Sequence, residues 1–379
     1  MNVHLKDSTK IRNATEIAHA LGRDFAARAA DYDATDSFAA ENFREIREAG
    51  LLSIGVPAEL GGGDASYREL CGMLRETARH CSGTALALAM HTHPLAAAVW
   101  RWRKGDKAPV EGLLKRVAAE NLMLLSTGGN DWLGGSGTAE KTEGGYLFSG
   151  RKRFVSGCEA GDILMTMARE GNTVLHAGVP MKSKGVRIEQ TWRTLGMRAS
   201  GSQDVVLDKV FVPEAAIAVR RPAGVWHPFF HLVSVIAWPL IYSVYRGVAE
   251  KLRDETVTLA MHKRQDDDTL QLIGALDTAL AAAVAAHEQM VALGETATPG
   301  EAVTSTMMTL KRVMTEQMLE AASIAMDAAG GSAFYRAAGI EKLFRDIQAA
   351  RYHPLAMQPQ HRLAGRIALG FTADGGEQK

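Results

Sequence analysis

The sequence is short of cysteine, of any excess charge and of long apolar runs. It has 3 cysteines in 379 residues and no CxxC pair, which excludes a disulfide framework and favours a reduced, cytoplasmic protein. Lysine and arginine total 43, and aspartate and glutamate also total 43. A nucleic-acid partner is therefore not expected, because a surface that tracks phosphates needs a cationic excess.

Membrane spans and export signals are missing as well. The most apolar stretch, residues 229–242, contains His231 and Pro239 and falls short of the roughly 20 apolar residues that cross a bilayer. We interpret it as a buried helix. The first 30 residues lack the basic start and apolar core of a secretory signal. We therefore expect no contact with a membrane.

The composition that remains is that of a folded protein with more than one domain. Hydrophobic residues make up 46% and charged residues 23%, which is ordinary for a globular chain and excludes intrinsic disorder. At roughly 100–200 residues per domain, the length predicts two or three domains.

Three textures divide the chain. Residues 1–120 repeat apolar positions at three- and four-residue spacing, as in FREIREAGLL and YRELCGMLRETARH, which is typical of helices. Residues 121–222 hold short apolar runs separated by Gly, Asn, Asp and Ser, which predicts a small antiparallel β domain. Residues 223–379 return to long helical patterns. The predicted fold is mainly α with a central β domain.

Two local features refine this prediction. Pro94 disfavours a helical conformation in the residue before it, so we expect a helix break near His93. In the C-terminal part a Gly330–Gly331 pair interrupts the helical pattern, and residues 340–351 are predicted to form the last helix.

Four strings in this order resemble the acyl-CoA dehydrogenase superfamily of flavoproteins. They are EAGLLSIGVPAELGGG, GYLFSGRKRFVSGCEAGD, TLGMRASGSQDVVLDKVFVP and DAAGGSAFYRAAGIEKLFRD. The resemblance covers nearly the whole chain and implies an N-terminal helical domain, a middle antiparallel β domain and a C-terminal helical bundle. It further implies a flavin-dependent oxidoreductase that acts on an acyl-CoA or a similar organic substrate and assembles as a homotetramer or homodimer.

The resemblance places Phe154 against the flavin ring and the Ser156 hydroxyl beside its reactive nitrogen. The residue types fit, because an aromatic face packs on a flat ring and a hydroxyl can stabilise negative charge on reduced flavin. Without the family context, Phe154 would be interpreted as strand core and Ser156 as a turn residue.

Further cofactor contacts are predicted from a Gly-rich loop and from the double glycine. Backbone N–H groups of the STGGND loop could meet flavin oxygens, since glycine allows close approach. The residues concerned are Ser126, Thr127, Gly129, Asn130, Gly330 and Gly331. Asp327 stands where the family commonly has Gln, three residues before the first glycine of the pair. The resemblance implies FAD, and a carboxylate at this place would repel its pyrophosphate, which leaves FMN open as the alternative.

The glutamate base of acyl-CoA dehydrogenases is absent from both of its usual places. The late site reads His353–Pro354, and the alternative site holds His231. Imidazole titrates near 6.5 and could take a proton at neutral pH. The predicted catalytic residues are His353, Ser156, His231 and His91. No metal is expected, because His227 and His231 lie four apart without an identifiable third ligand.

Three activities remain open at this stage. The leading interpretation is a flavin-dependent oxidoreductase that acts on an acyl-CoA or a similar organic substrate without the usual Glu, and acyl-CoA dehydrogenation is the commoner activity of the family. The RD…HP ending also resembles flavin monooxygenases of the same fold, including dibenzothiophene-type desulfurisation enzymes, which use a His at this place beside reduced flavin and oxygen. Such an enzyme needs a flavin reductase, and a dehydrogenase needs an electron-transfer partner. The third possibility is a flavin-binding member without turnover.

Overall fold

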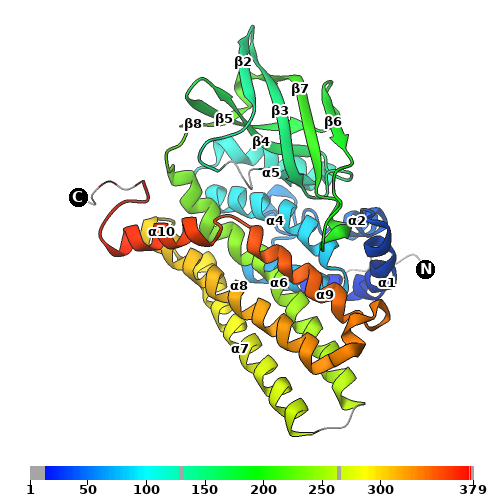
Figure 1. Cartoon of the computed structure of the whole chain (residues 1–379). Helices are drawn as coiled ribbons and strands as arrows, with labels where there is room; N and C mark the ends of the chain where they lie inside the picture. Colours follow the sequence, from blue (N-terminus) through cyan, green and yellow to red (C-terminus); the bar gives the residue numbers. More distant parts are fainter. Residues whose placement is uncertain (1–12, 128–131, 263–265, 375, 377–379) are drawn as a thin grey trace.

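A helical part, a β-sheet and a second helical part follow one another along the chain, which confirms the predicted fold (Figure 1). The computed structural model describes residues 13–127, 132–262, 266–374 and 376. The N-terminal helices are α1 Ala14–Thr35, α2 Ala40–Glu48, α3 Tyr67–His80, α4 Ser82–Arg103 and α5 Ala108–Glu120. The strands are β1 Leu124–Ser126, β2 Thr138–Thr142, β3 Gly145–Val155, β4 Ile163–Glu170, β5 Thr173–Pro180, β6 Val186–Glu189, β7 Gln203–Pro213 and β8 Ile217–Pro222.

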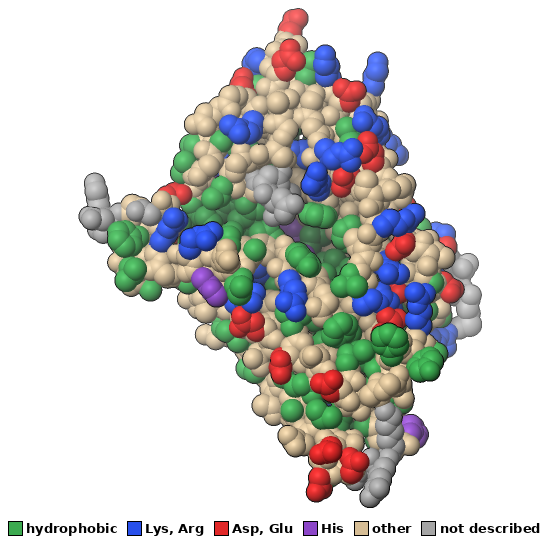
Figure 2. Space-filling view, viewed as in Figure 1, with side chains coloured by type: hydrophobic (Ala, Val, Ile, Leu, Met, Phe, Trp, Pro, Cys, Tyr) green, Lys and Arg blue, Asp and Glu red, His purple; other side chains and the backbone are tan. Residues whose placement is uncertain are grey.

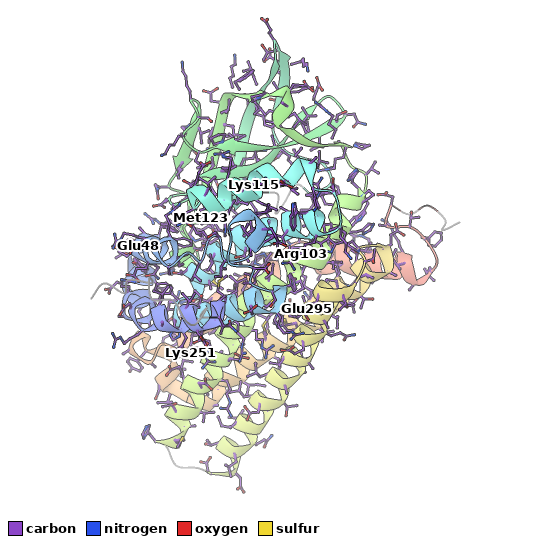
Figure 3. The ribbon with its side chains drawn as sticks, turned by 180° about the vertical axis from the view of Figure 1, so that it is seen from behind. Glu48, Arg103, Lys115, Met123, Lys251 and Glu295 are labelled. Carbon is purple, nitrogen blue, oxygen red and sulfur yellow. The ribbon has the colours of Figure 1, made fainter. Side chains whose placement is uncertain are left out.

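The sheet is mixed, whereas the sequence predicts an antiparallel one. Its strand order is β6-β7-β3-β2-β4-β5-β8, with β1 paired to β4. Most pairs are antiparallel, but β1 runs parallel to β4, and β2 meets β4 in parallel at one position. A parallel pair needs a long connection, and the β2–β3 hairpin supplies it between β1 and β4. Seen from behind, α5 with Lys115 lies beneath the sheet, close to Met123 just before β1 (Figure 3).

Helix α4 passes through Pro94 without the predicted break. Proline removes one backbone hydrogen bond and costs a helix interior about 3 kcal/mol. Burial offsets this cost, because α4 packs on α3, α5, α6 and β1. Pro94 lacks the N–H that would bond the Met90 carbonyl, so the helix is locally weakened at a position that borders a cavity.

Helix α6, Pro228–Met261, is the buried helix predicted from residues 229–242. By length and composition alone, α6 and α7, Asp267–Thr296, could each cross a membrane. The most apolar window of α6 is 89% buried inside the protein, as expected for a core helix, whereas that of α7 is 22% buried. His227 is the N-cap residue of α6 and accepts a hydrogen bond from the Phe229 N–H. It therefore lies outside the helical turn that holds His231.

The C-terminal part continues one helix further than predicted. After α8, Glu301–Ala329, come α9, Ile340–Ile347, and a 3₁₀ turn, Gln348–Tyr352. A further helix, α10, spans Met357–Ala368 and packs on α8. Pro359 falls in the first turn of α10, where its missing N–H has no helical partner to lose.

Candidate active site

A cavity of about 730 Å³ lies between one end of the β-strands and the helices α4, α6 and α9. Figure 2 shows hydrophobic side chains gathered around a hollow at this junction. Residues from β1, β3, the loop before β7, α4, α6 and the segment 345–356 line the cavity. We call it the larger cavity. Its size suits a ligand as large as a nucleotide cofactor.

Phe154 stands at the end of β3 and lines the larger cavity. Its φ of +59° lies in the left-handed region, which is rare for an aromatic residue. The ring is 49% exposed and meets Trp192 edge-on, with 6.1 Å between the ring centroids. The backbone thus holds a large apolar side chain out of the core and at the cavity wall.

Ser156 begins a chain of three buried hydroxyl groups. Its Oγ lies 2.7 Å from Ser202 Oγ, which lies 2.7 Å from Ser200 Oγ. Ser156 and Ser202 both line the larger cavity. Such a chain lets the Ser156 hydroxyl donate towards the cavity while it accepts a hydrogen bond from behind.

Ser126 ends the short strand β1, Thr127 follows it, and both line the larger cavity too. The Ser126 hydroxyl lies 3.0 Å from His93 Nε2, and the Thr127 hydroxyl donates to Met165 O and lies 3.0 Å from Thr166 Oγ1. The predicted contacts Gly129 and Asn130 fall outside the described residues.

His353 lies in the wall of the larger cavity among aromatic rings of α6. Its Nε2 is 2.6 Å from the Tyr245 hydroxyl. Lys311 on α8 reaches beneath this segment, and its Nζ donates to the carbonyls of His353, Pro354 and Leu355 at 2.7, 3.1 and 2.9 Å. His353, which the sequence predicts as the late catalytic residue, is therefore held by two helices: α6 bonds its ring and α8 bonds its backbone carbonyl.

Burial keeps this group of side chains uncharged or weakly charged. Burial, together with the nearby Lys311 charge, lowers the pKa of His353 to about 3, and burial lowers the pKa of Lys311 to about 7. Burial also raises the pKa of Tyr245 well above 10. Because the phenol stays protonated and His353 Nε2 is its only hydrogen-bond acceptor among the described residues, Tyr245 donates and His353 carries its own proton on Nδ1.

Arg345 and Asp346, the RD pair of α9, anchor the β part of the chain to the C-terminal helices. Asp346 is fully buried and accepts hydrogen bonds from Met197 N at 2.5 Å, from Lys342 Nζ at 2.6 Å and from the Ser82 hydroxyl. Arg345 is ion-paired with Asp33 at 2.6 Å. This carboxylate therefore fixes the loop that carries Trp192 to Met197 against α9 and the start of α4.

Four predicted residues lie outside the larger cavity. His91 is fully buried, its Nε2 lies 2.8 Å from Leu52 O, and its Nδ1 accepts from Leu124 N. His231 Nδ1 contacts Trp226 Nε1 and Thr304 Oγ1 at 3.2 and 2.9 Å. The geometry favours structural roles for both histidines, because neither lines the larger cavity and each ring is held by hydrogen bonds.

Gly330 and Gly331 are exposed at the end of α8 and contribute nothing to the cavity wall of the single chain. Within the described ranges, one group of side chains is arranged closely enough to hold a metal ion, namely His19, Glu76 and His80. It lies on α1 and α3, and none of the three lines the cavity.

Several residues of the site were not predicted. Trp238, Ile241 and Tyr245 line the cavity from one face of α6, and their spacing of three and four residues is the signal that could have grouped them. Lys311 gives no such signal, because a lysine in a helix is ordinarily a surface residue.

Three family models match consecutive parts of the chain. The acyl-CoA dehydrogenase N-terminal domain matches residues 12–121, the middle domain residues 126–210 and the C-terminal domain residues 243–358. The chain belongs to the acyl-CoA dehydrogenase family. This confirms the resemblance drawn from the four sequence strings.

Named members of this family with different activities resemble the chain to a similar degree. Dibenzothiophene monooxygenase of Mycolicibacterium goodii is 25% identical, with 92% of each chain covered. Putative acyl-CoA dehydrogenase YdbM of Bacillus subtilis is 26% identical, covering 88% of this chain and 91% of its own. Probable FMNH2-dependent monooxygenase SfnC of Pseudomonas putida is 26% identical over 65% of this chain and 62% of its own.

A solved structure of KijD3 in complex with FMN and dTDP-3-amino-2,3,6-trideoxy-4-keto-3-methyl-D-glucose superposes with a TM-score of 0.85 at 25% identity. The superposition covers 96% of this chain and 97% of that chain. The family resemblance thus extends to a member that holds FMN.

Proposed function

We propose that this protein is a flavin monooxygenase that uses reduced FMN and O2 to oxygenate a small organic substrate. One observation carries the proposal: among the described residues, no aspartate or glutamate lines the larger cavity, whereas His353 and Tyr245 form a hydrogen-bonded pair in its wall. Dehydrogenation at a carbon next to a carbonyl needs a general base, and the described cavity wall offers none with a suitable pKa.

The histidines cannot readily replace the missing base. A good general base has a pKa near the operating pH, but burial lowers the pKa of His353 to about 3 and that of His93 to about 3. Both are weak proton acceptors at neutral pH. A neutral His353 whose Nδ1 carries the proton is suited instead to donate a hydrogen bond to a developing negative charge.

The lining residues fit FMN. Phe154 and Trp192 offer aromatic faces, and Ser156 offers a hydroxyl backed by two others. Trp238 lines the cavity with an indole N–H that is buried and lacks an acceptor in the described part of the chain. Arg351 is the lining arginine that no described carboxylate pairs, and it suits a phosphate.

When bound, reduced FMN supplies two electrons to O2, so that one oxygen atom enters the substrate and the other leaves as water. The chain's own contribution is to bind, orient and exclude water. Phe154 and Trp192 shield one side of the cavity, and the Ser156 hydroxyl and His353 Nδ1–H present donors within it. Tyr245 fixes the His353 tautomer through its bond to Nε2.

Two partners belong to this proposal. A separate flavin reductase supplies reduced FMN, because the relative SfnC is named as FMNH2-dependent. The chain also self-associates through α7, whose apolar window is 22% buried in the single chain, since an apolar helix face of this length is ordinarily covered.

The test supplies reduced FMN, ¹⁸O2 and aromatic or organosulfur substrates to the wild type, to His353→Ala and to the control His361→Ala on α10. His361 is exposed and is not among the residues that line the larger cavity. We expect ¹⁸O in the product, a loss of about 100-fold in rate for His353→Ala, unchanged FMN affinity in both variants and full activity in the control. Anaerobic bleaching of the bound flavin by a saturated acyl-CoA, equal in wild type and His353→Ala, would refute the proposal.

A further inference from the structure

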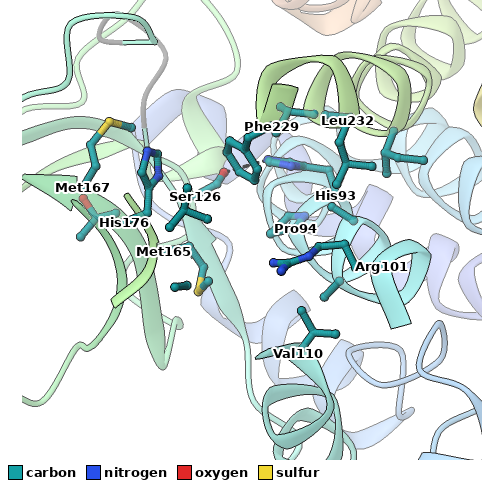
Figure 4. A pocket seen from close by; sticks show the side chains of 18 of the residues that line it. His93, Pro94, Arg101, Val110, Ser126, Met165, Met167, His176, Phe229 and Leu232 are labelled. Carbon is teal, nitrogen blue, oxygen red and sulfur yellow. Dashed lines mark hydrogen bonds between the residues drawn. The ribbon is translucent and has the colours of Figure 1, made fainter. Parts of the chain in front are cut away.

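A second, smaller cavity of about 200 Å³ adjoins the larger one. It lies between α4, α5 and α6 on one side and β4, β5 and β8 on the other (Figure 4). The residues that line both cavities are His93, Ser126, Thr127, Trp132, Val233 and Ala237. A molecule in the smaller cavity is therefore a direct neighbour of whatever occupies the larger one.

The wall of the smaller cavity is largely apolar, and most of its polar side chains already have partners. Thr127 is bonded to Thr166, and Ser126 to His93. Arg101 donates to Asp106 at 2.7 Å, so this guanidinium is neutralised at the pocket wall. A ligand here gains most from apolar contact, and it meets no unpaired charge in the described lining.

His176 on β5 is the exception. Its Nε2 lies 3.0 Å from Arg221 Nε. Arginine is permanently protonated and can only donate, so Nε2 must be the acceptor and the ring proton must sit on Nδ1. Burial and the Arg221 charge lower the pKa of His176 to about 3, which keeps the ring neutral. The tautomer is thus fixed by the neighbouring guanidinium.

The Nδ1–H of His176 is free to meet a ligand. No described residue accepts a hydrogen bond from Nδ1. The atom is also not one of the fully buried polar atoms that lack a partner. Since His176 lines the smaller cavity, this N–H is accessible from inside it (Figure 4).

The ring is also held rigidly. Phe229 meets it edge-on at 5.5 Å. Arg221 is fully buried, donates to Trp132 O at 2.6 Å and to Leu133 O at 2.7 Å, and lies 4.7 Å from the centre of the Phe230 ring. The donor therefore has a fixed position before any ligand arrives, which lowers the entropic cost of using it.

We propose that the smaller cavity is the substrate pocket and that His176 Nδ1–H selects uncharged apolar molecules with a hydrogen-bond acceptor, such as a ring nitrogen, an ether or a carbonyl oxygen. That the bound molecule is a substrate rests on the proposed function. The preference of the smaller cavity for such molecules rests on the geometry alone. An ionised ligand would lose its hydration in this wall without gaining an opposite charge.

Two variants separate the donor from the packing. His176→Met removes both ring nitrogens. His176→Gln restores the pair of roles, because its amide oxygen can accept from Arg221 while its amide N–H2 donates to the pocket. Met165→Leu is the matched control, since Met165 lines the same cavity without a polar hydrogen.

The probes are quinoline and naphthalene, which share a shape and differ in one acceptor nitrogen. Equilibrium dialysis of the FMN-saturated protein at neutral pH measures their affinities, with thermal melting of each variant as the folding control. We expect the wild type, His176→Gln and Met165→Leu to prefer quinoline by about fivefold, and His176→Met to bind both probes equally.

Equal affinities in the wild type, an unchanged preference in His176→Met, or no binding of either probe would overturn the proposal. Dialysis requires no turnover, and repeating it without FMN gives the preference independently of the cofactor. A protein that oxygenates substrates but shows no acceptor preference therefore refutes this inference alone. A protein that shows the preference but never oxygenates refutes the proposed function alone.

Discussion

At the scale of the residue, the site is built where local preferences are violated. Phe154 holds a left-handed backbone conformation that costs a non-glycine residue about 1–2 kcal/mol. Its ring is 49% exposed, so the fold gains little packing in return. A position that is strained and half-exposed in the protein alone is one where the ligand is expected to supply the missing contact.

Replacing Phe154 by Gly tests whether the strained backbone at this position serves ligand binding. Glycine adopts the observed φ without steric cost, so the relief of strain offsets the lost packing, and we expect the unfolding free energy without flavin to stay within about 1 kcal/mol of the wild type. The FMN dissociation constant should rise at least about tenfold, the effect of losing one aromatic contact.

Phe211→Gly is the control for that change. Phe211 is 50% exposed on β7 and has an ordinary strand conformation, so glycine there should destabilise the protein by about 1 kcal/mol and leave FMN binding unchanged. Chemical denaturation and flavin fluorescence titration measure both quantities. Equal destabilisation by the two substitutions, with unchanged FMN affinity, would contradict the strained-site argument.

At the scale of the element, α8 supports the segment that carries His353 through one side chain. Lys311 Nζ donates to three consecutive carbonyls, those of residues 353–355. In Lys311→Met these acceptors lose their donor, which costs about 1–3 kcal/mol, and the Tyr245–His353 pair loses its support. We expect faster amide hydrogen exchange in residues 350–357, measured by mass spectrometry, and a slower oxygenation step.

Glu316→Gln serves as the control on the same helix. Glu316 is exposed and is paired with Arg312, so losing its charge should cost about 0.5 kcal/mol or less and leave exchange near His353 unchanged. If both variants exchange alike in residues 350–357, Lys311 does not hold the segment.

Apolar spacing predicted the order of the elements, because helices and strands repeat their buried residues at different intervals. The structure confirms the predicted change from helices to strands and back to helices. Pro94 was the exception: it predicted a break that α4 does not have, because the local rule omits the packing that compensates the proline. His91 and His93 show the same limit at the site: both stand on α4, but His93 faces the cavities and His91 bonds Leu52, and spacing alone does not reveal which face is turned inward.

At the scale of the whole molecule, buried histidines link stability to pH. Burial is the main cause that lowers the pKa of each of five histidines to about 3 or 4. They are His91, His93, His176, His287 and His353. In the unfolded chain each titrates near 6.5. Below that pH the unfolded state binds protons that the folded state does not bind. The contribution of these histidines to stability is therefore complete above pH 6.5 and is lost on acidification.

Stability should therefore fall steeply between pH 7.5 and 5.5, above the range in which carboxylates titrate. Each histidine contributes up to about 1.4 kcal/mol over this interval, so thermal and denaturant midpoints should both drop at constant ionic strength. His287→Gln removes one titrating group while keeping a donor for Pro239 O, which His287 Nε2 approaches at 2.9 Å, and should reduce the slope by about one fifth. The exposed His262→Gln should leave it unchanged. A stability that is flat from pH 7.5 to 5.5 would mean that these imidazoles take up protons equally in the folded and the unfolded protein, and the donor roles assigned to neutral His353 and His176 would fail with it.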